Sequence, residues 1–128
     1  MNAAEVQIRL RAARKFLEAA EMYAEGDGPS DWQVAGANAV SAGIAASDAI
    51  TGKILGYCAQ GDAHGDALAV LEEATTPSKE PRKHLSALLT EKSGYQYGAA
   101  AVRQDVTRSA VRHARHLVEA AEKLVAGP

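Results

Sequence analysis

The stretch WQVAGANAVSAGIAASDAITGKILGY, from Trp32 to Tyr57, decides the fold of this chain. Alanine, glycine and serine make up half of it, and no proline interrupts it. Alanine has the highest intrinsic helix propensity, and small side chains allow neighbouring backbones to approach closely. The stretch therefore predicts a long helix at the centre of a tight all-α bundle.

A single acid, Asp48, lies among these small residues. It follows Ala37, Ser41 and Ile44 at helical steps of four, three and four residues, so that all of them share one face of the helix. We therefore expect Asp48 to point into the bundle as a structural polar group. Because a buried, unpaired carboxylate is costly, it should be held by a partner such as Lys92 or Tyr97.

Composition limits the possible classes of protein. The 128 residues include 28 alanines and predict a single domain over residues 1–128. A net charge of -2 gives no global attraction to nucleic acid or to anionic membranes. The single cysteine, Cys58, excludes an intramolecular disulfide and a metal site built from several cysteines. With no transmembrane segment or signal peptide in the sequence, we expect a cytoplasmic protein that does not contact membranes.

Apolar residues at steps of three and four, separated by breakers, predict four long helices and one short one. Ser30 or Asp31 should cap the second helix and Thr107 the last. A break containing two tyrosines is expected over residues 93–98, and residues 99–106 fit either an extended linker or an early helical turn. The helices should cover about Asn2–Ala24, Ser30–Tyr57, Asp62–Thr75, Glu80–Lys92 and Thr107–Pro128.

Four segments, in this order, resemble the HEPN-type helical bundles (higher eukaryotes and prokaryotes nucleotide-binding). Ala46-Ser-Asp-Ala-Ile50 resembles their alanine-rich A-x-D-A-hydrophobic segment, and His64 followed by Ala67 and Leu68 resembles their third helix. The third segment, Leu85-x-x-Leu88-x-x-x-Lys92-x-x-x-x-Tyr97, resembles the end of their fourth helix. The fourth segment resembles their closing helix and consists of Val106-Thr107 with Ala110, Ala114, Leu117 and Val118. The resemblance implies an up-down antiparallel bundle, dimerisation through late helices, and binding of RNA, a nucleotide or a partner protein.

The nuclease members of the HEPN family carry an arginine followed four to six residues later by a histidine. The matching place in this chain runs from Lys92 to Tyr97 and contains no histidine. Arg108 and His113 satisfy the bare spacing, but they lie farther along, on the last helix. We therefore expect a binding protein without catalytic residues and, as the alternative, a ribonuclease that uses Arg108 and His113.

Arginines form one stripe on the last helix, because Arg108, Arg112 and Arg115 follow one another at steps of four and three. Such a stripe can hold RNA phosphates, with Lys92 and the aromatic ring of Tyr97 as further binding residues. The competing interpretation is a solvated face whose arginines form ion pairs along their own helix with Glu119 and Glu122.

The other histidines predict structural roles. His64, in the first turn of the third helix, can pair with Asp48, Asp62 or Asp66. The spacing of His84, His113 and His116 offers no metal-ligand pattern, so we expect no metal and no cofactor.

The expected partners are therefore a second copy of the chain, RNA or a nucleotide, and a nucleotidyltransferase if the chain is half of a toxin–antitoxin pair. A purely structural, oligomeric bundle is the remaining alternative.

Overall fold

The computed structural model describes the backbone of residues 1–60, 64–97 and 102–127, with the side chains of all of these except residues 64, 65, 96 and 97. The prediction of an all-α chain is confirmed, since the described residues form helices and no strand. A shorter helix of 12 residues accompanies four helices of 18 to 27 residues. These helices are α1 (Ala3–Ala24), α2 (Pro29–Leu55), α3 (His64–Thr75), α4 (Glu80–Tyr97) and α5 (Gln104–Ala126).

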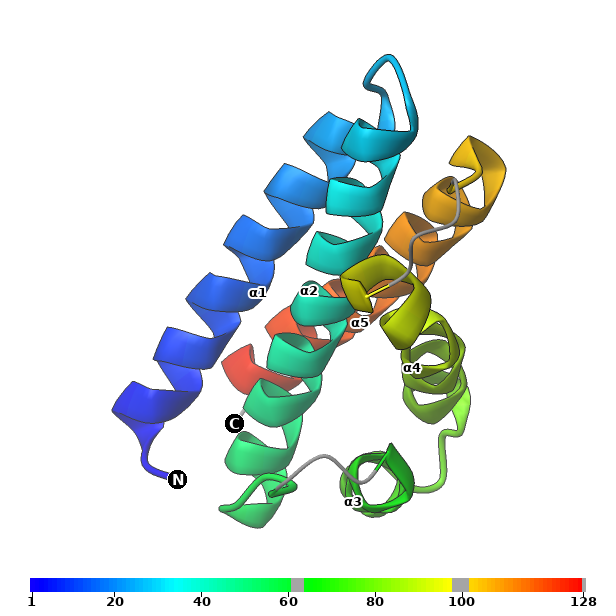
Figure 1. Ribbon diagram of the computed structural model, residues 1–128. Coiled ribbons are helices and arrows are strands. Elements are labelled where there is room, and N and C mark those ends of the chain that lie inside the picture. Colours follow the sequence, from blue (N-terminus) through cyan, green and yellow to red (C-terminus); the bar gives the residue numbers. More distant parts are fainter. Residues whose placement is uncertain (61–63, 98–101, 128) are drawn as a thin grey trace.

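The small-residue helix α2 lies at the centre, in contact with all four other helices (Figure 1). α1 runs beside it in the opposite direction, so that the amino group of Met1 bonds the carbonyl of Gly56. α5 covers another side of α2, and α3 lies across the end of the bundle, where Figure 1 shows it nearly end-on. All alanines of α2 except Ala37 are fully buried, and the larger core side chains come mainly from its neighbours, including Leu71, Leu85, Leu88 and Leu117.

The two ends of α2 follow from a proline and a glycine. Gly28 is the N-cap and Pro29 the first helical residue, a position where the missing N–H of proline costs nothing. The expected cap at Ser30 or Asp31 is therefore wrong; the carboxylate of Asp31 instead accepts a hydrogen bond from the Asp27 amide, 3.0 Å away. At the other end Gly56 adopts φ 83°, the left-handed conformation that ends a helix.

The predicted break after Lys92 is wrong, because α4 continues to Tyr97. Tyr95 explains the extension: the residue is only 4% exposed, and its ring packs against Gly36 of α2. A Cβ at Gly36 would lie only 1.9 Å from the Tyr95 ring, so the glycine makes room for it. Burial of this ring stabilises the last turns of α4 in spite of Gly94, which is unfavourable in a helix interior.

The last helix begins earlier than predicted, with Arg103 as its N-cap rather than Thr107. Thr107 is completely buried in the first turns of α5. Its hydroxyl donates to the carbonyl of Trp32 at 3.2 Å, which leaves its oxygen to accept from the hydroxyl of Tyr95, also at 3.2 Å. Thr107 thus joins α2, α4 and α5 at one end of the bundle. Residues 99–101 of the undecided linker lie outside the described residues, as does the predicted start of the third helix at Asp62.

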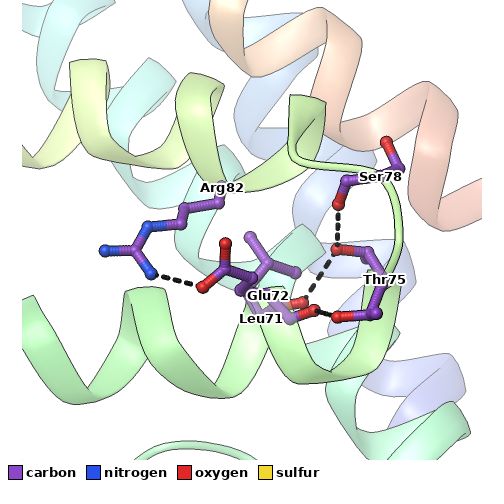
Figure 2. A network of polar contacts seen from close by, with 6 residues as sticks. Leu71, Glu72, Thr75, Ser78 and Arg82 are labelled. Atoms are coloured by element: carbon purple, nitrogen blue, oxygen red, sulfur yellow. Dashed lines mark hydrogen bonds and ion pairs between the residues drawn. The ribbon is translucent and has the colours of Figure 1, made fainter.

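A polar network fixes the turn between α3 and α4 (Figure 2). The Thr75 hydroxyl is within hydrogen-bond distance of the carbonyls of Leu71 and Ser78, at 3.0 and 3.2 Å. Arg82 of α4 reaches back to the carboxylate of Glu72 on α3, with Nη1 and Oε2 2.7 Å apart. The turn therefore holds α3 against α4 as one unit.

Candidate functional site

The arginine stripe of α5 lines an open groove beside α1. The groove has a volume of about 410 Å³, and both helices contribute to it. The residues that line it are Glu21, Ala24, Glu25, Arg108, Val111, Arg112 and Arg115. It therefore combines cationic side chains with an apolar floor, the buried faces of Ala24 and Val111.

Acids of α1 partly neutralise these arginines. Arg108 bonds Glu25 through two nitrogens, at 3.0 and 2.7 Å, and Arg115 bonds Glu21 at 3.0 Å. The hydrogen bond from Arg108 lowers the pKa of the Glu25 carboxyl, and the same bond raises the pKa of Arg108. The ion pairs with Glu119 and Glu122 of the competing interpretation are not observed: within the described residues Arg108 and Arg115 pair across to α1, and Glu122 pairs with Arg14.

Arg112 differs from its two neighbours on the stripe. It is exposed between them, and no ion pair involves it among the residues that the structure describes. The three arginines and two glutamates of the groove leave one positive charge in surplus. The lining of the groove therefore carries a small positive net charge in a chain that is acidic overall.

His113 lies on a different side of α5 from the groove arginines. Its Nδ1 is 2.9 Å from Nδ1 of His84 on α4, whereas Arg108 turns toward α1. Burial, as the largest cause, lowers the pKa of His113, and the neighbouring His116 and Arg112 lower it further. The structure thus does not bring the Arg108 guanidinium and the His113 ring to one place within a single chain.

His84, His113 and His116 form one cluster between α4 and α5. The rings of His84 and His116 stack almost parallel, with centroids 4.5 Å apart and planes inclined by 9°. Ring nitrogens bind metals in the plane of the ring, so two stacked rings cannot point at the same ion. Across the described ranges no three histidine, cysteine or acidic side chains are arranged to hold a metal.

Asp48 is half-buried and paired with Arg9 of α1. The predicted partner Lys92 forms no ion pair with it, and the side chain of Tyr97 lies outside the described residues. Arg9 Nη2 and Asp48 Oδ2 are 3.2 Å apart. Burial raises the pKa of the Asp48 carboxyl, and the Arg9 charge offsets only part of this effect. Asp48 also lines a cavity of about 30 Å³ between α2, α3 and α4, which is room for a single water. This pocket is too small for an organic ligand, and a structural role fits Asp48 best.

Lys92 is half-buried on α4 and is not among the residues that line the groove. The side chains of His64 and Tyr97 lie outside the described residues. Sequence reasoning missed Glu21, Glu25 and Arg9, because the spacing along one helix does not show which residues of another helix face it. It also missed an open hollow of about 670 Å³ where Lys79, Arg82 and Lys83 gather beside Glu72.

None of the helices in the described ranges combines the length and the apolarity needed to cross a bilayer. Comparison of the sequence with known proteins finds no matching family model and no matching curated protein.

Proposed function

We propose that this chain is a HEPN-like helical module that binds a phosphate-bearing ligand, RNA or a nucleotide, in the groove between α1 and α5. The resemblance allows RNA, nucleotides and partner proteins, and the groove favours the two classes that carry phosphate. The observation that carries the proposal is the Arg108–Arg112–Arg115 face, in which Arg112 holds no ion-pair partner among the described residues.

Phosphates can replace the carboxylates that now hold the outer arginines. The fork of Arg108 already binds the two oxygens of Glu25, and a phosphate presents oxygens in a similar geometry. The Arg108–Glu25 and Arg115–Glu21 pairs are exposed to solvent, where ion pairs contribute little to stability. Exchanging one anion for another therefore costs the fold little.

The same proposal includes the finer features of the resemblance: an up-down antiparallel bundle of the HEPN type, a homodimer, and association with a nucleotidyltransferase as half of a toxin–antitoxin pair. In such a homodimer, or in a pair with a nucleotidyltransferase, the groove would supply the contact to the nucleic acid or nucleotide. Binding in the groove needs no catalytic residue.

Binding of a short, labelled single-stranded RNA, followed by fluorescence anisotropy, tests the proposal, with ATP as a competitor. Arg112→Ala should weaken binding and reduce the slope of log affinity against log salt by about 0.7, the loss of one phosphate contact on a single strand. Arg11→Ala, the same change at an exposed site of α1 that does not line the groove, is the matched control and should bind like the parent.

Glu25→Gln provides the complementary test, because it removes the acid that competes for Arg108. We expect it to bind RNA more tightly than the parent. The proposal fails if the parent does not bind either ligand, or if Arg112→Ala and Arg11→Ala weaken binding equally. Loss of binding in Lys83→Ala with Arg112→Ala unaffected would move the site to the hollow beside Glu72.

A further inference from the structure

The histidine cluster of His84, His113 and His116 closes the contact between α4 and α5. Two of its members are joined by a hydrogen bond between their Nδ1 atoms, 2.9 Å apart. Side-chain exposure of His84 is only 15%, so this bond lies mostly out of water. A hydrogen bond of this kind requires one nitrogen with a proton and one without.

The surroundings of His84 indicate which ring donates. Its Nε2 faces the carboxylate of Glu80 at 3.7 Å, an arrangement that favours a proton on Nε2. His84 Nδ1 is then unprotonated, and His113 Nδ1–H donates to it. A proton taken up by His113 at Nε2 would leave this bond in place, whereas a proton taken up by His84 at Nδ1 would place two N–H groups face to face and abolish it.

Most of the charges around the cluster oppose the protonation of His84. Glu80 of α4 favours a proton on His84, whereas the rings of His116 and His113 and the ammonium of Lys83 disfavour it. A further proton on His113 is disfavoured by His116 and by Arg112 of α5. Of the acids on the neighbouring helices, Asp48 is paired with Arg9 and Glu72 with Arg82. No charged group of α2 or α3 within the described ranges contributes to the shifts of either ring. Burial, as the largest cause, lowers the pKa of both His84 and His113.

We propose that this cluster is a proton-operated latch, closed at neutral pH by the His113–His84 hydrogen bond and released by acid, which frees α4 from α5. The inference does not depend on the proposed ligand of the groove. Because Arg82 and the turn at Thr75 tie α3 to α4, the two helices should loosen together.

The direction of the pH effect follows from the lowered pKa values. The unfolded chain takes up protons at the ordinary histidine value near 6.5, before the folded chain does. The stability that the latch contributes is therefore complete above that pH and decreases as the pH falls toward the folded-state values. Acid therefore lowers the stability that this neutral pair contributes, whereas acid raises the stability contributed by a histidine that a carboxylate holds in its charged form.

Hydrogen exchange of backbone amides, measured at several pH values between about 7.5 and 5 around the histidine pKa and corrected for intrinsic exchange, tests the latch. In the parent, acid should accelerate exchange in α4 and its contacts on α5 by roughly tenfold for each pKa unit between the folded and unfolded states. The amides of α1 and α2 are the internal control, since global unfolding would accelerate them equally.

His113→Asn and His84→Asn are the test variants, because asparagine can keep a hydrogen bond across the contact and cannot be protonated in this range. We expect the acid acceleration in α4 to become smaller in both variants, since each removes one of the two titrating rings. NMR titration of the histidine rings in the parent supplies a readout that does not depend on the variants and should show the pair titrating in two steps. Unchanged acid acceleration in the variants, equal acceleration of all helices, or ordinary independent titration of His84 and His113 would each overturn the proposal.

Discussion

The pair formed by Arg9 and Asp48 shows how one charged residue is accommodated inside a helix of small side chains. Desolvation raises the pKa of Asp48 in spite of Arg9, so that the fold holds the ionised carboxylate at a net cost. As the pH rises from the ordinary value of 3.8 through the raised folded-state pKa, this group lowers the free energy of unfolding. Arg9 is thus needed to offset part of the cost of burying the Asp48 carboxylate.

Removing Arg9 should consequently destabilise the protein more than neutralising Asp48 does. We expect Arg9→Ala to lower the free energy of unfolding by about 1 kcal/mol, because it leaves a half-buried carboxylate without its donor. Asp48→Asn should be neutral or stabilising near pH 7, since its amide oxygen can still accept from Arg9. Urea denaturation of both single variants and the double variant measures the coupling.

Arg11→Ala is the control: Arg11 is exposed, lies two residues after Arg9 on α1, and should contribute little to stability. If Asp48→Asn destabilises the protein more than Arg9→Ala does, the account of a costly buried charge is wrong.

Sequence could place Asp48 on a helix stripe but could not name its partner. The stripe of Ala37, Ser41, Ile44 and Asp48 is only half-buried, because it lies at the margin of the α2 contacts rather than at their centre. Arg9 comes from a helix 39 residues earlier in the chain, and only the packing of α1 on α2 brings the two together. Local periodicity contains no information on such a pair.

At the scale of helices, glycines set how closely α2 approaches its neighbours. We expect Gly36→Ala to lower the free energy of unfolding by about 1–3 kcal/mol, since the added Cβ must displace the buried Tyr95 ring. Gly94→Ala is the matched control within α4, where a Cβ meets no atom within 4 Å. It should stabilise the protein by about 0.5–1 kcal/mol through helix propensity.

Thermal and urea denaturation of the two variants measure this difference. Equal effects of the two substitutions would contradict the close packing of α2 against α4.

Two helix boundaries that sequence reasoning missed, the end of α4 and the start of α5, share one physical cause. Ser93-Gly94 and the two tyrosines have the local character of a break, and Thr107 has that of an N-cap. Tyr95 and Thr107 instead form a buried hydrogen bond with each other and occupy interior helical positions. Tertiary burial overrode local propensity at both places, whereas the long periodic stretches of α1, α2 and α5 were read correctly as helices.

At the scale of the whole molecule, we expect a homodimer. Large apolar side chains remain exposed on several helices, with Met22 66% and Ile8 56% exposed on α1 and Ile54 45% exposed on α2. Covering some of them in a second copy would remove apolar surface from water. Light scattering at micromolar concentration should give twice the chain mass of 13.4 kDa. A mass of 13.4 kDa at this concentration would contradict the dimer.

The opposed directions of Arg108 and His113 lead us to expect no RNA cleavage. A general base must lie within hydrogen-bond reach of the proton it removes, and a cation must meet the charge that develops on the phosphate. Here Arg108 is held by Glu25 of α1, and His113 is bonded to His84 of α4. One phosphate therefore cannot contact both groups within a chain, and cooperation would require a dimer in which Arg108 of one protomer faces His113 of the other.

Incubation of labelled RNA with the parent and with His113→Ala, followed by gel electrophoresis, should leave the RNA intact in both. Cleavage by the parent that disappears in His113→Ala would identify the chain as a ribonuclease and show that the two residues meet between protomers.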